Sequence, residues 1–344
     1  MSKVGIIGTG WGARVQVPAF REAGLEVVAL AGRDAEKTQK LAQELEVTPF
    51  DDWRTLVASP DLDLISIVTP PSEHLEMATA ALAAGKHVLS EKPTALDAAE
   101  AERLVEAARR APDQIAIIDH ELRFLPGWRE ARDRVRELGG IRYAEARYAS
   151  PGRGDRNRAW NWWSDAGHGG GIWGAVGSHF VDALRYFGME IEAVQAMLHT
   201  AIDTRSGKPV TADDVAAVHL RLRGGAVAML TFSAVASGPD EASVLTIHGE
   251  DAAMRFAGEE VLLARRNEPF ARIAGGELEE RPGNSPGGAF GSGTVHLGRA
   301  LRAALSGDRE ALAPAATFAD GLAQQRVLDA ARASAREGRW VTVG

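Results

Sequence analysis

A glycine-rich turn near the start of the chain could cradle phosphate groups. The turn, Gly8-Thr9-Gly10-Trp11-Gly12-Ala13, directly follows the apolar run Val4–Ile7 and has the spacing G-x-G-x-x-A. Glycines in such a turn permit a tight bend and let the backbone approach a pyrophosphate at the start of the next helix. The alternative is a glycine-rich turn in an α/β protein that binds no cofactor. The residues predicted to bind a dinucleotide here are Gly8, Gly10, Trp11, Gly12 and Ala13.

The end of the second apolar run, Val27–Ala31, bears on which dinucleotide fits. Chains that bind NAD usually carry an acid about 20 residues after the glycines, where it holds the ribose. Here the run is followed by Gly32, Arg33 and Asp34. Gly32 presents no carboxylate to repel a 2′-phosphate, and Arg33 could pair with that phosphate. We therefore predict NADP, with NAD possible, because Arg33 could instead be a solvated charge and Asp34 an N-cap or the ribose ligand.

Two polar clusters follow later apolar runs. Thr69-Pro70-Pro71-Ser72-Glu73-His74 comes after Leu64–Val68, and Ser90-Glu91-Lys92-Pro93 comes after His87–Leu89. Ligands of open α/β sheets bind at the carboxyl ends of the strands. A lysine there could donate a proton to, or accept one from, a substrate oxygen. The alternatives are a surface lysine before a proline turn and, for His74, a residue that merely starts a helix.

Taken together, these motifs resemble the glucose-fructose oxidoreductase / inositol dehydrogenase (Gfo/Idh/MocA) family, whose hallmark is Glu-Lys-Pro at this place. The resemblance continues in His120-Glu-Leu-Arg-Phe124, in Gly177-Ser-His-Phe-Val-Asp182 and in the closing Trp340-Val-Thr-Val. It implies that Lys92 touches the reacting hydroxyl and that Pro93 fixes the backbone around it. The residues that it implies on the cofactor side are Thr69, Pro70, His74, Glu91, Lys92 and Arg123.

The resemblance also implies a role for His179 and reveals a departure from the family pattern. Dehydrogenases of the family usually carry an Asp four residues before this His, one helical turn away on the same face. Here that position is Ala175. Asp182 could hold the imidazole and contact substrate, or make a structural hydrogen bond within the helix; Asp165 or His168 could also fill the gap. We predict that Lys92 and His179 are the catalytic residues.

A loop over residues 149–171 has an unusual composition. It contains three tryptophans and three arginines, a combination that would suit a sugar face together with an anionic group. Trp160 and Trp163 are therefore predicted to bind substrate. Packing between domains or subunits is the alternative, because tryptophan rings bury much area.

The composition bounds the class of protein. A chain of 344 residues suggests two domains. The net charge of −8 argues against a nucleic-acid partner, which would need a clustered basic face. The chain has no cysteine, and its nine histidines lack metal-ligand spacing, so we predict no metal. No apolar run suits a membrane helix or signal peptide, so we predict a cytoplasmic protein without a membrane partner.

The patterning predicts two different architectures. Short apolar runs alternate with the helical stretches Ala35–Leu45, His74–Ala84 and Leu96–Arg109, which indicates an N-terminal Rossmann domain (1–121) with a doubly wound parallel sheet. Strand-like runs at Val194–His199 and Val215–Leu222 are followed by others with short turns. They predict an open, mostly antiparallel sheet in a C-terminal α+β domain (122–344) for substrate binding and oligomerisation. Residues 282–293 are predicted to form a flexible loop.

The expected function is that of an NAD(P)-dependent dehydrogenase or reductase acting on CH–OH groups. Its substrate would be a small carbohydrate-like molecule: a sugar, a sugar derivative or a cyclic polyol. Because few helices interrupt the second domain's sheet, one sheet face should pair with another subunit and give a homodimer or homotetramer. The competing hypothesis is a catalytically impaired NAD(P)-binding sensor on the same fold, which Ala175 favours.

Overall fold

The structure, a computed structural model, describes residues 2–239, 241–274 and 288–344. The chain divides into two compact units. Unit 1 comprises Met1–Leu125 and Glu280–Leu322, and unit 2 comprises Pro126–Glu279 and Ala323–Gly344.

Unit 1 is built on a seven-stranded sheet with the order β17-β6-β5-β4-β1-β2-β3. The neighbouring strands are parallel, except that β17 runs antiparallel to β6. This order confirms the predicted Rossmann-type parallel sheet. The strands are β1 (Lys3–Ile7), β2 (Glu26–Ala31), β3 (Thr48–Phe50), β4 (Leu64–Ile67), β5 (His87–Ser90), β6 (Ala116–Ile118) and β17 (Ala316–Thr317).

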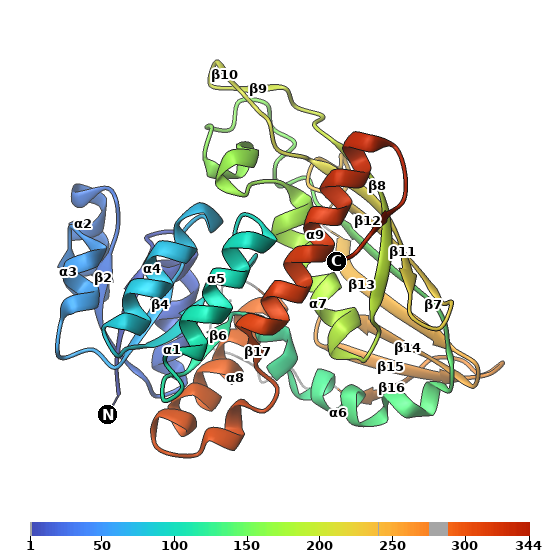
Figure 1. Ribbon diagram of the computed structural model, residues 1–344, viewed down its shortest axis with the longest axis horizontal. Coiled ribbons are helices and arrows are strands. Elements are labelled where there is room, and N and C mark those ends of the chain that lie inside the picture. Colours follow the sequence, from blue (N-terminus) through green and yellow to red (C-terminus); the bar gives the residue numbers. More distant parts are fainter. Residues whose placement is uncertain (1, 240, 275–287) are drawn as a thin grey trace. The chain divides into compact units, whose positions relative to one another are not determined.

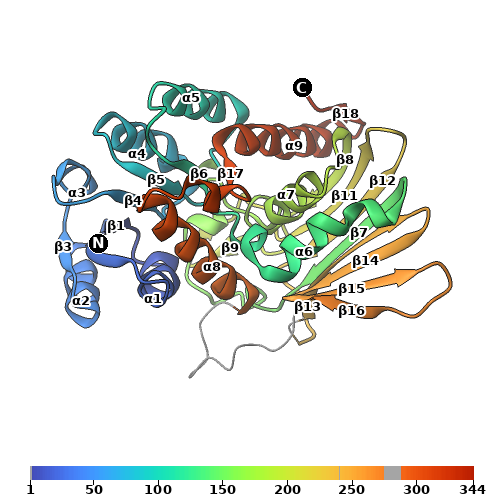
Figure 2. The ribbon, with the colours of Figure 1, turned by 90° about the horizontal axis from the view of Figure 1, so that it is seen from below.

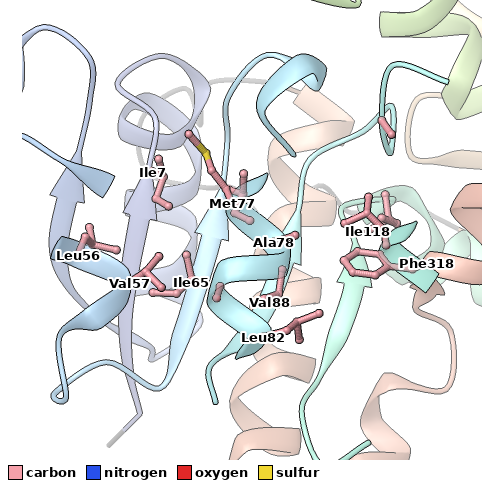
Figure 3. Close-up of a cluster of buried hydrophobic side chains, with 14 of the residues drawn as sticks. Ile7, Leu56, Val57, Ile65, Met77, Ala78, Leu82, Val88, Ile118 and Phe318 are labelled. Atoms are coloured by element: carbon pink, nitrogen blue, oxygen red, sulfur yellow. The ribbon is translucent and has the colours of Figure 1, made fainter. Parts of the chain in front are cut away.

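Helices cover both faces of this sheet. Because successive side chains of a strand point to opposite faces, neighbouring residues of β1 pack against different helices. Ile7 packs with Met77 of α4 in one buried cluster, shown in Figure 3. Ile6, its neighbour along β1, belongs to a second cluster with Phe20 of α1 and Leu301 of α8. The helices of unit 1 are α1 (Val17–Glu22), α2 (Ala35–Leu45), α3 (Trp53–Ala58), α4 (Pro71–Ala83), α5 (Ala98–Arg109) and α8 (Gly288–Leu305).

Helix α8 corrects two expectations. It packs on α1 so closely that a Cβ at Gly298 would lie 2.8 Å from the Cβ of Ala23. The single boundary expected after residue 121 therefore does not describe the chain, because α8 and β17 complete unit 1 although they follow most of unit 2 in sequence. The predicted flexible loop is wrong over Gly288–Gly293, which starts α8; residues 282–287 lie outside the described residues.

Unit 2 contains a nine-stranded sheet with the order β16-β15-β14-β13-β7-β12-β11-β8-β18. Within this sheet β7 and β12 are parallel and the other paired strands are antiparallel, as predicted for an open, mostly antiparallel sheet. The strands are β7 (Ile141–Ala149), β8 (Ile191–His199), β11 (Val215–Leu222), β12 (Val227–Ser233), β13 (Glu241–Gly249), β14 (Ala252–Ala257), β15 (Glu260–Arg265), β16 (Ala271–Ala274) and β18 (Val341–Thr342).

Three helices pack on this sheet: α6 (Pro126–Arg134), α7 (Ser178–Tyr186) and α9 (Phe318–Glu337), which begins in unit 1. Figures 1 and 2 show α6 and α7 lying along the sheet. Trp128 of α6 packs on Phe256 with ring centroids 5.1 Å apart, and Phe180 of α7 packs on Phe232 at 4.9 Å. Across the described residues, no helix combines the length and the apolar character needed to cross a membrane.

Candidate active site

The carboxyl ends of neighbouring strands bring four polar segments together in unit 1. At each of four strands, the residue that follows the strand donates its backbone N–H to the carbonyl of the last residue in the neighbouring strand of the sheet. These segments therefore share one edge of the sheet, where ligands of such sheets bind. The bonds are Gly8 to Ala31 (2.8 Å), Val68 to Ile7 (2.8 Å), Glu91 to Ile67 (2.9 Å) and Asp119 to Ser90 (2.8 Å).

The three glycines of the first loop serve different purposes. Gly8 has φ 139°, and a Cβ there would lie 2.2 Å from the carbonyl oxygen of Val68. A Cβ at Gly12 would lie 2.8 Å from Ile6. A Cβ at Gly10, in contrast, would meet nothing within 4 Å. The fold thus requires the first and third glycines, whereas Gly10 leaves open space in which a pyrophosphate could approach the backbone.

The helix after this loop starts with a π-helical turn, Gly12–Gln16, a feature that is frequent at functional sites. The amide of Gln16 is fully buried. Its Nε2 donates to Oδ2 of Asp119 at 2.8 Å and lies 3.4 Å from Oε1 of Glu91, while its Oε1 accepts from Ser66 at 2.6 Å. One amide therefore links β4 to the residues that follow β5 and β6, one of which is Glu91, the neighbour of Lys92 in sequence.

Glu91 and Asp119 form a carboxyl pair in this cluster, in which Asp119 is buried and Glu91 is partly buried. Burial raises the pKa of Asp119 well above its usual value, and the charges of Glu91 and Glu121 raise it further. Burial also raises the pKa of Glu91, although the Lys92 ammonium and hydrogen bonds oppose this. The backbone N–H of Lys92 donates to Oε2 of Glu91 at 3.2 Å. Because adjacent buried carboxylates repel each other, the pair favours holding one proton next to partly buried Lys92.

We expect Asp119→Asn to stabilise the protein at neutral pH. A raised folded-state pKa means that the wild type loses stability as pH rises from the unfolded-state value through the folded-state value. Asparagine imitates the protonated acid, so the variant should gain about 1 kcal/mol or more in unfolding free energy near pH 8 and less near pH 5. Denaturant titrations across this range measure the difference. The exposed variant Asp113→Asn is the control, and a pH-independent difference would contradict the raised pKa.

His74 occupies a structural position between two of the loops. Its side chain has no exposed surface. Nε2 lies 2.9 Å from the carbonyl oxygen of Thr69, and Nδ1 lies 3.1 Å from that of Pro93. Burial lowers the pKa of His74, which favours the neutral imidazole. His74 thus ties the loop after β4 to the Lys92–Pro93 turn, whose peptide bond is cis, and it presents no surface to a cofactor.

The segment after β2 has no room for an acid at Gly32. A Cβ there would lie 2.4 Å from Cγ2 of Thr9 and 2.5 Å from Oγ1 of Thr38. Asp34 is the N-cap of α2 and accepts from the backbone N–H of Lys37 at 3.0 Å. Arg33 is largely exposed and forms an ion pair with Glu73. Of the possibilities left open by the sequence, Asp34 takes the capping role, and Arg33 is a tethered but accessible cation.

His179 lies in unit 2, just after a second π-helical turn, Trp173–Gly177. The turn is held firmly: the backbone N–H of Trp173 donates to Oδ2 of Asp213 at 2.7 Å, and its indole Nε1 donates to the Leu328 carbonyl at 3.2 Å. His179 is 6% exposed. The other two side chains considered with it, at Ala175 and Asp182, are also buried.

Three residues that the sequence assigned to cofactor or substrate binding contact other residues of their own unit through an ion pair, a hydrogen bond and a cation–π contact. Arg123 is buried, and its guanidinium lies 3.7 Å from Oδ1 of Asp320. Trp160 donates from Nε1 to the carbonyl of Pro209 at 3.1 Å. Trp163 lies under the guanidinium of Arg153 at 4.9 Å. Their assignments to cofactor and substrate remain predictions.

Sequence reasoning missed Gln16, Asp119 and Asp213. Asp119 had a usable signal, because it directly follows the apolar run Ile115–Ile118, as Lys92 follows an earlier run. Gln16 interrupts an apolar stretch, but its partners come from three strands. Asp213 lies 40 residues from the turn that it anchors, and no local pattern marks it.

Comparisons with known proteins agree with this geometry. The family described as "Oxidoreductase family, NAD-binding Rossmann fold" matches residues 2–118, and the GFO/IDH/MocA C-terminal domain matches residues 128–255. An uncharacterized oxidoreductase of Synechocystis is 34% identical over 72% of this chain and 69% of its own length. Glucose-fructose oxidoreductase domain-containing protein 2 of Mus musculus is 31% identical over 99% of this chain and 93% of its own.

Solved structures give the same result. A levoglucosan dehydrogenase in complex with NADH and levoglucosan has a TM-score of 0.88 and 25% identity, covering 100% of this chain and 99% of its own. An oxidoreductase domain protein from Kribbella flavida has a TM-score of 0.89 and 30% identity over the same shares. The chain therefore belongs to the Gfo/Idh/MocA family of NAD-binding oxidoreductases.

Proposed function

We propose that the protein is an NAD(P)-dependent dehydrogenase or reductase that acts on the hydroxyl/keto pair of a sugar, sugar derivative or cyclic polyol. The observation that carries this proposal is the place of Lys92. It follows β5 at the sheet edge that also holds the glycine loop, beside the carboxyl pair of Glu91 and Asp119. The similarity to a levoglucosan dehydrogenase supports a carbohydrate-like substrate.

In the proposed reaction, each residue has a separate task. A nicotinamide dinucleotide bound at the glycine loop would supply the redox chemistry, as the acceptor of a hydride from the substrate carbon. The Lys92 ammonium donates a hydrogen bond to the substrate oxygen and stabilises the negative charge that develops there. The imidazole of His179 accepts the hydroxyl proton, so that alcohol becomes ketone and electrons and protons balance. Reduction reverses these steps. Gln16 and His74 position the Glu91–Pro93 segment.

Turnover separates this proposal from the sensor hypothesis. Purified protein would be mixed with NAD⁺ or NADP⁺ and a panel of sugars, polyols and sugar acids, while formation of reduced nicotinamide is followed. Substrate-dependent reduction supports an enzyme. Tight cofactor binding without turnover on any of them would favour the sensor, which Ala175 also favours.

For the cofactor, we propose that NADP(H) binds more tightly than NAD(H). Gly32 presents no carboxylate where NAD-binding chains usually carry one, and Arg33 can exchange its exposed pairing with Glu73 for a 2′-phosphate. Arg33→Ala should weaken NADP(H) binding by about 10-fold and leave NAD(H) binding unchanged. Calorimetric titration of both cofactors measures this, with the exposed Lys40→Ala as control. A wild-type preference for NAD(H) would refute the assignment.

For assembly, we propose a homodimer or homotetramer formed through the unit 2 sheet. Met197 of β8 and two β12 residues, Val227 and Met229, are 61%, 44% and 45% exposed. Large exposed apolar side chains that gather on one surface mark contact sites, and pairing with another copy would bury them. Light scattering should therefore give an oligomer at micromolar concentration and a smaller species for Met197→Glu with Met229→Glu. A monomeric wild type would contradict the proposal.

A further inference from the structure

Unit 2 buries two arginines, one of which donates to the backbone of the other, and among the described residues both guanidinium groups donate to uncharged acceptors only. Arg153 is 9% exposed and Arg205 is 1% exposed. Arg153 donates from Nη2 to Ser164 Oγ at 3.2 Å and to Asn161 Oδ1 at 3.4 Å. Arg205 donates to the backbone carbonyls of Asp155, at 2.6 Å, and of Arg153.

The two positive charges are poorly compensated. Within the described part of the chain, neither guanidinium forms an ion pair with a carboxylate. Burial, together with the neighbouring charges of Arg205 and Arg158, lowers the pKa of Arg153 to about 10, although buried Asp214 opposes the shift. Burying a cation without a counter-ion is costly, and a bound anion would remove that cost.

Part of the hydrogen-bonding capacity of the two guanidinium groups is also unused. Among the described residues, Nε and Nη1 of Arg153 have no partner, and Nε of Arg205 has none either. Guanidinium groups bind the oxygens of carboxylates and phosphates through such paired donors. Aromatic rings adjoin Arg153, since Trp163 lies 4.9 Å from its guanidinium and Trp162 packs on Trp163 at 5.9 Å with the two rings tilted by 58°. Both indoles are partly exposed.

We propose that Arg153, supported by Arg205, binds the oxyanion of an acidic sugar, with Trp163 beside the sugar ring. The ligand carries either a carboxylate, as in a sugar acid, or a phosphate, as in a sugar phosphate. This inference rests on the proposed function where it names the ligand as the substrate. The anion site itself can be measured without turnover.

Calorimetric titration of the full-length protein, in a buffer free of phosphate, tests the site. The probes are glucuronate, glucose 6-phosphate, glucose and inorganic phosphate. We expect glucuronate, glucose 6-phosphate or both to bind about 10-fold or more tightly than glucose. The tighter of the two identifies the anion as a carboxylate or a phosphate. Equal binding of all three sugars would overturn the proposal. If inorganic phosphate binds as tightly as glucuronate and glucose 6-phosphate, the site holds an adventitious ion only, and the proposal is overturned.

Variants connect the effect to Arg153. Arg153→Gln should abolish the preference for the acid, whereas Arg156→Gln, an exposed change in the same loop, should preserve it. If Arg153→Gln does not fold, Arg153→Lys replaces it. This variant keeps the positive charge but loses the paired N–H donors of the guanidinium, so the preference for the acidic sugar over glucose should fall several-fold. A preference that persists in the folded variant would overturn the assignment. If the protein binds the acidic sugar but turns over no substrate, the proposed function alone is refuted. If it turns over neutral sugars and shows no preference for an acidic sugar, this site alone is refuted.

Discussion

Lys92→Met should lower kcat/KM by about 10²-fold or more while leaving the affinity for dinucleotide nearly unchanged. The lysine is proposed to act on the charge that develops at the substrate oxygen, so its loss should appear in the chemical step. Methionine keeps the length and apolar character of the stem, and the Glu91–Pro93 segment retains its backbone contacts.

Steady-state kinetics and cofactor titration measure the two effects separately. Lys40→Met, on the exposed side of α2, is the matched control and should leave both unchanged. Full turnover in Lys92→Met would mean that the lysine has no catalytic role. Equal losses of turnover and cofactor binding would instead place it among the cofactor ligands.

Gly10→Asp should weaken dinucleotide binding by about 10²-fold without lowering the stability of the fold. The added Cβ meets no protein atom within 4 Å, so the loop can accept it. The new carboxylate would occupy the space proposed for the pyrophosphate, where like charges repel and desolvation is costly. Calorimetry gives the affinity, and denaturant unfolding gives the stability.

The control for this variant is Gly238→Asp, because a Cβ there also meets nothing within 4 Å and the residue lies in unit 2. It should leave both quantities unchanged. Cofactor binding that survives in Gly10→Asp would show that the pyrophosphate does not rest on this loop.

Much of the fold follows from local patterns. Helix α2 matches its predicted range, Ala35–Leu45, because Asp34 caps it and the Glu46 C-cap takes a left-handed conformation. Helix α8 was missed at its start because its first six residues include three glycines and a serine, whose propensity for helix is low. Burial against α1 stabilises it instead, and tertiary packing of that kind leaves little trace in the local sequence. Strands β14 and β15 were also overlooked, although their buried positions alternate.

The candidate site was predictable where it lies at strand ends. The glycines follow the first apolar run directly, and their spacing located them. Lys92 stands three residues after Leu89, and the resemblance of Glu91-Lys92-Pro93 to the family motif singled it out. The pairing of Glu91 with Asp119 depends on which strands are neighbours, and the bridging Gln16 reaches them from a helix 75 and 103 residues away in sequence. Arg153 and Arg205 are 52 residues apart, and only the folded loop brings them together.

The central claim, hydride transfer between a carbohydrate-like substrate and nicotinamide, can be tested directly with an isotope. A substrate found in the turnover screen would carry deuterium on its reacting carbon, and the nicotinamide recovered after reaction would be analysed by mass spectrometry. We expect one deuterium in the nicotinamide for each product molecule with the wild type, and product formation slowed by about 10²-fold or more with Lys92→Met. Product formed with the deuterium released to water would contradict the account, as would cofactor binding with no hydride transfer from any sugar, polyol or sugar acid.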